Sequence, residues 1–538
     1  MSTAMKHRTH SIAVLSAIAL LVVLPPSAVP LNPATAHAAE PLRLHLRSRE
    51  ETASGSGDFQ VVAGEAEWDP ARTAIVVCDM WDQHWCRGAT ERVVEMAPRM
   101  NEVLNEARRR GVLIIHCPSG TMDFYKDAPQ RKLAQQAPPV KLKPLTGGWC
   151  ALAGGKEPAL PFDNARDRCD CTPQCPHGNP WRRQIDTLEI ADADAITDSA
   201  EALYLMRQRG IDHVILLGVH ANMCVLGRPF AIRQLCAQGL NVVLMRDMTD
   251  SVHDSGSPPE GLDHFRATER VIEHIEKYWC PSITSQDFLG GAAFSFHEDP
   301  RPHVVLLIGE DEYQTDRTLP AFADAELADR GLRLTVIHAN PRDLNDFPGL
   351  EALDSAEMLL VSVRRRTPPA EQLARIRAFV ESGKPVAGIR TASHAFSLRN
   401  NQPPPSGHAA WPEFDAQVLG GHYVGHHDAP GAGVPRTLVW VVPNETDHPV
   451  LAHVPSDEIA VGSSLYKTSP LSSSATALMM GRVEGIEPQE PVAWTNTHAM
   501  GGRVFYTSLG HIDDFRLPAF RRLLLNGVFW ALDKPVPE

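Results

Sequence analysis

Residues 213–239 read HVILLGVHANMCVLGRPFAIRQLCAQG, and this stretch decides the fold of the first half of the chain. Its mostly apolar start predicts a buried strand, and the spacing that follows predicts a helix over 224–238. The same pattern appears earlier, with TAIVVCDM at 73–80, a helical pattern over 92–110, and GVLIIHC at 111–117. Continuous apolar strands joined by amphipathic helices indicate a parallel sheet that is covered on both faces.

The alternation of strand and helix continues on either side of this stretch. A helix over 200–209 precedes it and the strand LNVVLMRD (240–247) follows it, while an irregular, cysteine-rich insertion occupies about 125–183. Turn residues over 280–301 then mark a boundary. The strands of a second array are HVVLLIG (303–309), LRLTVIHA (332–339), AEMLLVSV (356–363), LVWVV (438–442) and RVFYTSL (503–509), and its helices are 369–382 and 517–532.

The sequence therefore predicts an α/β fold with two three-layer, Rossmann-like domains and mainly parallel sheets. A chain of 538 residues is long enough for two or three cores at roughly 150 residues each. The predicted boundaries are a signal peptide at 1–38, an N-terminal extension at 39–70, a first domain at 71–291, a linker at 292–301 and a second domain at 302–538.

The start of the chain predicts export. Basic residues at Lys6 and Arg8 precede an apolar run at 12–24, and an Ala-His-Ala sequence ends at Ala38, as in secretory signals. We therefore expect a periplasmic or secreted protein with no membrane partner beyond the signal. A net charge of −14 without a clustered basic face argues against nucleic acid, whose phosphates need basic side chains.

Ten cysteines are present, and all lie between Cys78 and Cys280. Because oxidising compartments favour disulfides, we expect some of them to pair. The pairing is expected among four cysteines of the insertion, whose connectivity the sequence leaves open: Cys150, Cys169, Cys171 and Cys175.

Cys224 and Asp79 are the candidate catalytic residues. Cys224 stands where a predicted buried strand passes into a helix, and free N–H groups there would stabilise a thiolate and a developing oxyanion. Asp79 ends the strand TAIVVCD, at the edge where parallel sheets bind ligands, and is suited to act as a general base. Alternatively, Cys224 is a small buried apolar residue or half of a disulfide, and Asp79 caps a loop.

The stretches CDMWDQHW and GVHANMCVLGRPFAIRQLCAQGLNVVLMRD resemble the isochorismatase-like cysteine hydrolase family, over about 71–291. That family includes nicotinamidases, carbamoyl amidases and isochorismatases. The resemblance implies an Asp-Lys-Cys triad in which Cys224 is the nucleophile and Asp79 the aspartate. It also implies a cis peptide between Val219 and His220, and an oxyanion hole formed by the backbone N–H groups of His220 and Cys224.

The family lysine is missing from its usual place. Before the 200–209 helix the sequence reads TLEIADADAITDSAEAL, in which Asp192, Asp194 and Asp198 stand where the lysine is expected. Loss of activity is one consequence; a substitute cation is the other. The candidate substitutes are His84, Arg183, His220 and Arg228.

No metal ligand is assigned, and no cofactor is predicted with a defined site; a bound divalent metal is the alternative. His116 and Asp123 follow the second strand without the Asp-x-His spacing of metal-binding family members. A second option joins Asp82, His84 and Cys86 to the CDCTPQCPH loop, because clustered cysteine and histidine suit zinc.

The second half resembles the ThuA-like, trehalose-utilisation family, which is related to class I glutamine amidotransferases. The motifs are HVVLLIGEDEYQT, ESGKPVAGIRTASHAF, WPEFDAQVLGGHYVGHH and GRVFYTSLGH, over about 302–537. Amidotransferases carry a cysteine at the strand-to-helix elbow that GIRTASH occupies, but this half has none. The candidate pocket residues are Glu310, Tyr313, His394, His422, His426 and His511, with His338, His427 and His498 as further histidines.

We therefore expect an exported cysteine hydrolase that cleaves a C–N or related bond of a small metabolite, with a carbohydrate-associated second domain. The expected partners are a small-molecule substrate, with a sugar-related one as an option, and further copies of the chain in a homo-oligomer. The main alternative is a catalytically degenerate carbohydrate-binding or scaffold protein. A third interpretation makes only the second domain catalytic, as a metal-assisted sugar enzyme.

Overall fold

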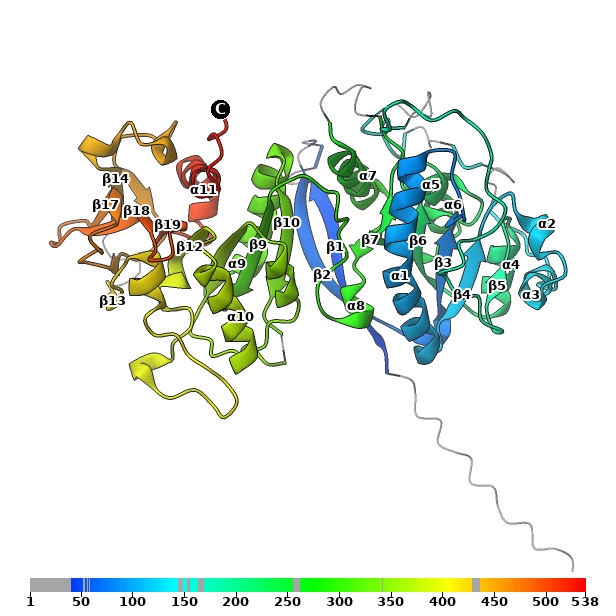
Figure 1. Ribbon diagram of the computed structural model, residues 1–538, viewed down its shortest axis with the longest axis horizontal. Helices are drawn as coiled ribbons and strands as arrows, with labels where there is room; N and C mark the ends of the chain where they lie inside the picture. Colours follow the sequence, from blue (N-terminus) through cyan, green and yellow to red (C-terminus); the bar gives the residue numbers. More distant parts are fainter. Residues whose placement is uncertain are drawn as a thin grey trace, which may run out of the picture. The chain divides into compact units, whose positions relative to one another are not determined.

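The computed structural model describes residues 40–51, 54–55, 57, 59–143, 149–151, 155–162, 169–254, 262–340, 342–427 and 436–538. The predicted signal peptide lies outside the described residues. None of the helices in these ranges has the length and apolar character that a membrane crossing requires. Figure 1 shows the strands of the two sheets described below and the helices that pack on them.

The first sheet has eight strands in the order β2-β1-β8-β7-β6-β3-β4-β5. The six strands from β8 to β5 pair in parallel, whereas β1 pairs antiparallel with both β2 and β8. The strands are β1 (Leu42–Glu51), β2 (Phe59–Trp68), β3 (Thr73–Cys78), β4 (Leu113–Cys117), β5 (Ala195–Ile196), β6 (His213–Val219), β7 (Asn241–Asp250) and β8 (Ser282–Ile283). The helices are α1 (Arg87–Arg110), α2 (Met122–Tyr125), α3 (Pro129–Gln135), α4 (Glu201–Gln208), α5 (Cys224–Gly227), α6 (Ile232–Ala237), α7 (His264–Tyr278) and α8 (Gln286–Leu289).

The second sheet has nine strands in the order β10-β9-β11-β12-β19-β18-β17-β14-β15. The five strands from β10 to β19 are parallel, and the rest are antiparallel. The strands are β9 (His303–Gly309), β10 (Arg333–His338), β11 (Met358–Val363), β12 (Val386–Ile389), β14 (Thr437–Val441), β15 (Ile459–Val461), β17 (Thr476–Val483), β18 (Glu490–Thr497) and β19 (Arg503–Thr507). The helices are α9 (Thr315–Phe322), α10 (Ala370–Glu381) and α11 (Pro518–Ala531), while β13 (Gly425–His426) and β16 (Tyr466–Lys467) form a separate pair.

Each large sheet has an apolar cluster on both faces, as the continuous apolar strands predict. In β3, Ile75 and Val77 pack with α1, whereas Val76 packs on the opposite face with α4. Two further clusters cover the two faces of the second sheet. The predicted fold class, α/β with mainly parallel sheets in two Rossmann-like domains, is confirmed.

Two elements differ from the sequence prediction. Residues 224–238 form two short helices, α5 and α6, because Pro229 favours an extended conformation at Arg228 and ends the first helix there. The stretch 39–70, predicted as an extension, contains the β1–β2 hairpin, which joins the first sheet through β8. The break after α5 leaves Arg228 in an extended conformation, with its side chain bonded to Asp79.

Candidate active site of the first domain

Asp79 follows β3 directly and is fully buried, with 0% of its surface exposed. Its φ of 47° lies in the left-handed region, which non-glycine residues seldom adopt and which is often found at functional sites. The Ser119 backbone N–H donates to one carboxylate oxygen at 2.7 Å, and Arg228 Nε donates to the other at 3.0 Å. The carboxylate is therefore held from two sides.

Cys224 is the first residue of α5 and lies against this carboxylate. It is buried, with 5% of its surface exposed, and its thiol lies close enough to Asp79 for the charge of that carboxylate to raise its pKa. The backbone of His220 has the opposite effect and lowers the pKa of this thiol. The structure thus brings together the two residues that the sequence nominated as nucleophile and base.

Arg228 makes the third contact. It follows α5 in an extended conformation, with φ of −66° and ψ of 158°, and forms an ion pair with Asp79. The Trp149 ring lies 5.5 Å from its guanidinium carbon, within cation–π range. Arg228 is therefore the candidate cation that the structure places at the predicted acid–thiol pair.

Burial controls the protonation of this pair. Burial raises the pKa of Cys224 well above its usual value; the charge of Asp79 adds to this effect and that of Arg228 opposes it. Burial also raises the pKa of Asp79, against the lowering effects of Arg228 and of hydrogen bonds from Cys224 and Ser119. These shifts favour the protonated thiol over the thiolate that the sequence predicts at a helix start.

The other proposed cations do not contact Asp79. Arg183 donates to Asp186 at 2.5 Å and lies 3.9 Å from Asp82. His84 is uncharged near neutral pH, because burial and then the charges of Arg92 and His177 lower its pKa to about 4. Among the predicted alternatives, only Arg228 is positioned to replace the lysine.

The backbone near Cys224 fits the predicted oxyanion hole in part. The peptide between Val219 and His220 is cis, which confirms the expectation from the family resemblance. Within the described chain, the Cys224 backbone N–H makes no hydrogen bond, as is usual at the first residue of a helix. The neighbouring Ala221 N–H is already used, because it donates to the Asp250 carbonyl at 2.7 Å.

The His220 side chain is a buried polar group next to this backbone. Only 2% of its surface is exposed, and in the described structure neither ring nitrogen has a hydrogen-bond partner. Its ring lies 4.8 Å from that of His84, which stacks with Trp81 and Trp181 at 6.0 and 5.9 Å. An imidazole buried without a partner is costly, so this ring is suited to bind a polar group of a ligand.

A cavity of about 340 Å³ opens at His84. It is lined by residues 83–85 on one side and by Pro176 and residues 178–180 of the insertion on the other. The insertion therefore forms one wall of this cavity, and His84 lies on the other.

The suggested metal ligands are engaged elsewhere. His116 is fully buried, with its ring nitrogens 2.8 Å from Gln184 and 3.1 Å from Asp194, and Asp123 is exposed. Asp82 accepts backbone N–H groups of Arg182 and Arg183. His116 and Asp123 therefore do not form a common metal site, and the Asp82 carboxylate is already bonded to backbone N–H groups.

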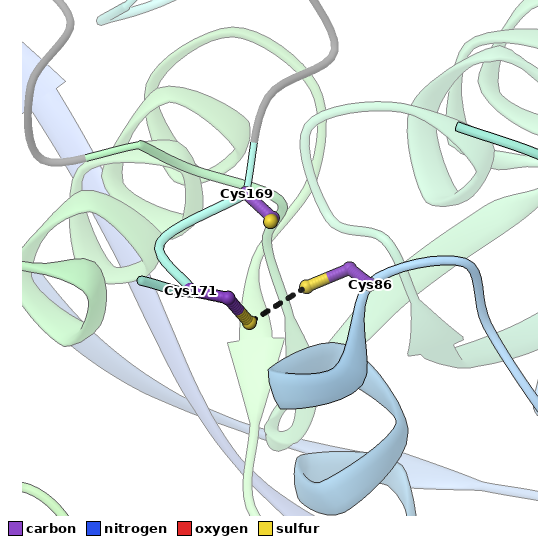
Figure 2. Close-up of side chains that lie close together, drawn as sticks. All are labelled: Cys86, Cys169 and Cys171. Carbon is purple, nitrogen blue, oxygen red and sulfur yellow. Dashed lines mark hydrogen bonds between the residues drawn. The ribbon is translucent and has the colours of Figure 1, made fainter. Parts of the chain in front are cut away.

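The insertion cysteines are grouped differently from the prediction. Cys169 and Cys171 lie beside Cys86, whereas Cys150 is elsewhere and donates its backbone N–H to Gly227. None of the ten cysteines, all of which lie in the described part of the chain, forms a disulfide. Figure 2 shows Cys86, Cys169 and Cys171 converging.

In the second domain, Arg390 occupies the elbow after β12. It has a φ of 42° and is buried between two tyrosines, with its guanidinium carbon 4.0 Å from the Tyr313 ring and 4.7 Å from the Tyr466 ring. It donates to the Ser508 carbonyl and the Ser464 hydroxyl at 3.0 Å each. No role is predicted for Arg390 from the sequence, although it stands at the elbow in GIRTASH.

The predicted pocket residues of this domain divide into two groups. The His394 ring stacks on Tyr423 at 4.5 Å, and His511 and His426 lie 5.9 and 6.3 Å from Tyr313 and Tyr466. Glu310 is not a pocket group, because it accepts the N–H groups of residues 312, 313 and 315 at the start of α9. His422 is exposed.

The second domain also has a recognisable family relationship. Residues 304–531 match the family model described as ThuA, trehalose utilisation. The resemblance inferred for the second half is therefore confirmed over those residues. No protein with curated annotation matches the chain.

Several solved structures resemble parts of the chain. A ThuA-like protein from Bacteroides uniformis has 17% identity and a TM-score of 0.33, covering 44% of this chain and 94% of its own. A cysteine hydrolase from Pseudomonas syringae pv. phaseolicola has 18% identity and a TM-score of 0.25, covering 40% and 91%. An isochorismatase family protein from Burkholderia thailandensis has 15% identity and a TM-score of 0.23, covering 40% and 93%. The two last-named structures match the N-terminal part of the chain.

Proposed function

We propose that the first domain is a cysteine hydrolase that cleaves a C–N or related bond of a small metabolite. The observation that carries the proposal is the buried group of Cys224, Asp79 and Arg228. In it, a buried thiol lies beside a carboxylate that an arginine holds at 3.0 Å. A nucleophile, a base and a cation in mutual contact are the groups that this chemistry needs.

In the proposed reaction, Asp79 accepts the thiol proton while the Cys224 sulfur attacks the carbonyl carbon of an amide. The tetrahedral oxyanion is stabilised by the backbone N–H groups of Cys224 and His220. The C–N bond then breaks, and the amine leaves with the proton that Asp79 holds. Water attacks the thioester, giving one proton to Asp79, which returns it to the departing sulfur.

Arg228 stabilises the ionised form of Asp79 in this proposal and so takes over the charge of the absent lysine. Arg228 lowers the pKa values of both Asp79 and Cys224, whereas burial raises them, and this supports the role. His220 is proposed to hydrogen-bond a polar group of the substrate, because its buried ring lacks a partner in the described chain. The cavity at His84 then supplies the route by which a small substrate approaches.

The test is turnover of a panel of primary amides, N-carbamoyl compounds and enol ethers by the wild type and by Cys224→Ala. The matched control is Cys236→Ala, in α6, which removes a partly buried thiol away from Asp79. We expect at least one compound to be hydrolysed by the wild type and the control, and not by Cys224→Ala. Equal rates in all three proteins would contradict the assignment.

We further propose that the second domain binds a sugar-related ligand at the group of rings around Arg390. The supporting observation is that a cation lies at the elbow, between two tyrosines, so the site favours binding over nucleophilic catalysis. Calorimetric titration with trehalose, glucose and glucuronate should give saturable binding for at least one sugar, weakened by His394→Ala. Absence of binding to all three would contradict this proposal.

We also propose that the chain is exported, on the basis of the N-terminal pattern at 1–38. Expression of the full chain in a bacterial host, followed by fractionation and N-terminal sequencing, tests it. The mature protein is expected outside the cytoplasm and to begin near Ala39. Retention of the whole intact chain in the cytoplasm would contradict export.

A further inference from the structure

Four cysteines from two distant segments meet at the start of α1. Cys86 is the residue that caps this helix, and Cys169, Cys171 and Cys175 belong to the insertion. Figure 2 shows the side chains of Cys86, Cys169 and Cys171 pointing toward one another. Cys175 packs against the same cluster and is the candidate fourth member, although its sulfur lies outside the set of three that are all within 4.8 Å of one another.

The spacing of the sulfurs is that of ligands around one ion. The sulfurs of Cys86 and Cys171 are 3.8 Å apart, and that of Cys169 lies within 4.8 Å of both. Sulfurs bound tetrahedrally at about 2.3 Å from zinc lie about 3.8 Å from one another. A disulfide would instead require about 2.05 Å.

Each sulfur also accepts a backbone N–H. The first three residues of α1 donate to three different cysteines: Arg87 to Cys175 at 3.4 Å, Gly88 to Cys171 at 3.3 Å, and Ala89 to Cys86 at 3.4 Å. The fourth sulfur, that of Cys169, accepts the N–H of Cys175 at 3.3 Å. The sulfurs of Cys86, Cys171 and Cys175 therefore accept the N–H groups that a helix start leaves without partners.

Such an arrangement suits negatively charged sulfur. Backbone N–H groups and the positive end of the 24-residue helix α1 stabilise thiolates, and thiolates are the form that binds metal. Second contacts of this kind, which orient the ligands, are a regular feature of metal sites. Four such sulfurs in one group exceed what a single disulfide or a single reactive cysteine would need.

We propose that Cys86, Cys169, Cys171 and Cys175 bind one zinc ion as a tetrathiolate. Sulfur-only tetrahedral sites select zinc or iron, and a closed four-cysteine site without an open position is typical of structural zinc. Binding displaces the four thiol protons and leaves a site of charge −2, which faces the α1 N-terminus. The site keeps Cys86 and the three cysteines of the CDCTPQCPH loop from the second group suggested by sequence, and leaves out Asp82 and His84.

The zinc ion would fix the insertion against α1. The ligands flank both walls of the cavity at His84, because Cys86 follows residues 83–85 and Cys175 precedes Pro176. A structural metal here therefore orders a surface through which ligands enter. This role does not depend on the proposed hydrolase, since metal content and cysteine chemistry can be measured without a substrate.

The test uses the full chain, purified without added reductant and dialysed against metal-depleted buffer. Elemental analysis should find one zinc per chain in the wild type and in the control Cys236→Ser, whose thiol is outside the cluster. Cys171→Ser should lose the ion, whereas Cys175→His, which keeps a zinc ligand, should retain it. Removal of zinc with a chelator should increase amide hydrogen exchange over 169–180, compared with the zinc-loaded protein.

A thiol count and intact mass of the native protein separate the alternatives. Zinc predicts that all four cysteines react with a thiol reagent after unfolding in chelator. Two disulfides predict four fewer reactive thiols and a lower mass, and would overturn the proposal. Iron in place of zinc, or equal zinc content in the wild type and a folded Cys171→Ser protein, would overturn it as well.

Discussion

Asp79 in the first domain and Arg390 in the second hold the same backbone conformation at the same kind of place. Each directly follows a parallel strand, is buried, and has a positive φ, 47° and 42° respectively. Their surroundings differ in chemistry: a thiol and an arginine meet Asp79, whereas two tyrosine rings enclose Arg390. The comparison shows that a strained turn places a charge at the sheet edge, and that its neighbours decide what the charge can do.

The physical reason lies in the group that each charge contacts. A carboxylate next to a thiol can exchange a proton with it, and the raised pKa values of both groups keep that proton within the pair. An arginine does not deprotonate in proteins, so Arg390 can only donate hydrogen bonds and attract negatively charged groups. Proton transfer is thus expected only in the first domain.

The largest expected effect is a difference in turnover between a substitution beside Asp79 and one at Arg390. Cys224→Ala should lower turnover of a hydrolysed amide by on the order of 10⁴-fold or more, because no other group can form the thioester. The measurement is kcat by amine release. Arg390→Lys, which alters only the second turn, should leave the rate at the wild-type value; an equal loss in both variants would break the comparison.

Asp79→Asn should lower kcat by about 10³-fold, because general-base transfer is lost while the side chain keeps its size. In the wild type, the rate should rise with pH as Asp79 ionises, since only the carboxylate accepts the thiol proton. The variant should lack this rise. A wild-type pH profile in Asp79→Asn would show that another group is the base.

Arg228→Gln should lower kcat/KM by about 10-fold to 100-fold and change its pH dependence. Arg228 lowers the pKa of Asp79, so its removal raises that pKa further and moves the acid limb to higher pH. Arg183→Gln is the matched control, because Arg183 pairs with Asp186 and not with Asp79. An unchanged acid limb in Arg228→Gln would remove Arg228 from the site.

The smallest expected effect concerns the stability of the second turn. Arg390→Gln should reduce the free energy of unfolding by about 1–3 kcal/mol, since its bonds to Ser464 and Ser508 are lost in a buried place. Denaturant unfolding monitored by fluorescence measures this change. Amide turnover by the first domain should stay unchanged, and a parallel loss of turnover would contradict the division of roles.

Two of the three residues at the first-domain site, Cys224 and Asp79, could be predicted from the sequence, whereas the position of Arg228 could not. The apolar strand before Cys224 and the carboxylate after TAIVVC are local patterns, so both residues could be nominated. The Arg-Pro pair at 228–229 carried the signal for the break that directs Arg228, but the apolar spacing beyond it suggested one continuous helix.

Contacts between distant segments were the harder part. Cys86 could be grouped with the CDCTPQCPH loop on residue type, but no local pattern indicated that Asp82 instead accepts the backbone N–H groups of Arg182 and Arg183. Glu310 was nominated for a pocket, yet the N–H groups of the following turn occupy its carboxylate. Arg390 was overlooked because its role depends on Tyr466, which comes from a separate strand.

The central claim is that Cys224 carries the acyl group during turnover. Rapid quenching of the wild type with an amide that it hydrolyses, followed by peptide mass spectrometry, tests this claim most directly. The account predicts a mass increase equal to the acyl group on the peptide that contains Cys224, and none in Cys224→Ala. Turnover at the full rate with the adduct on another residue would contradict it.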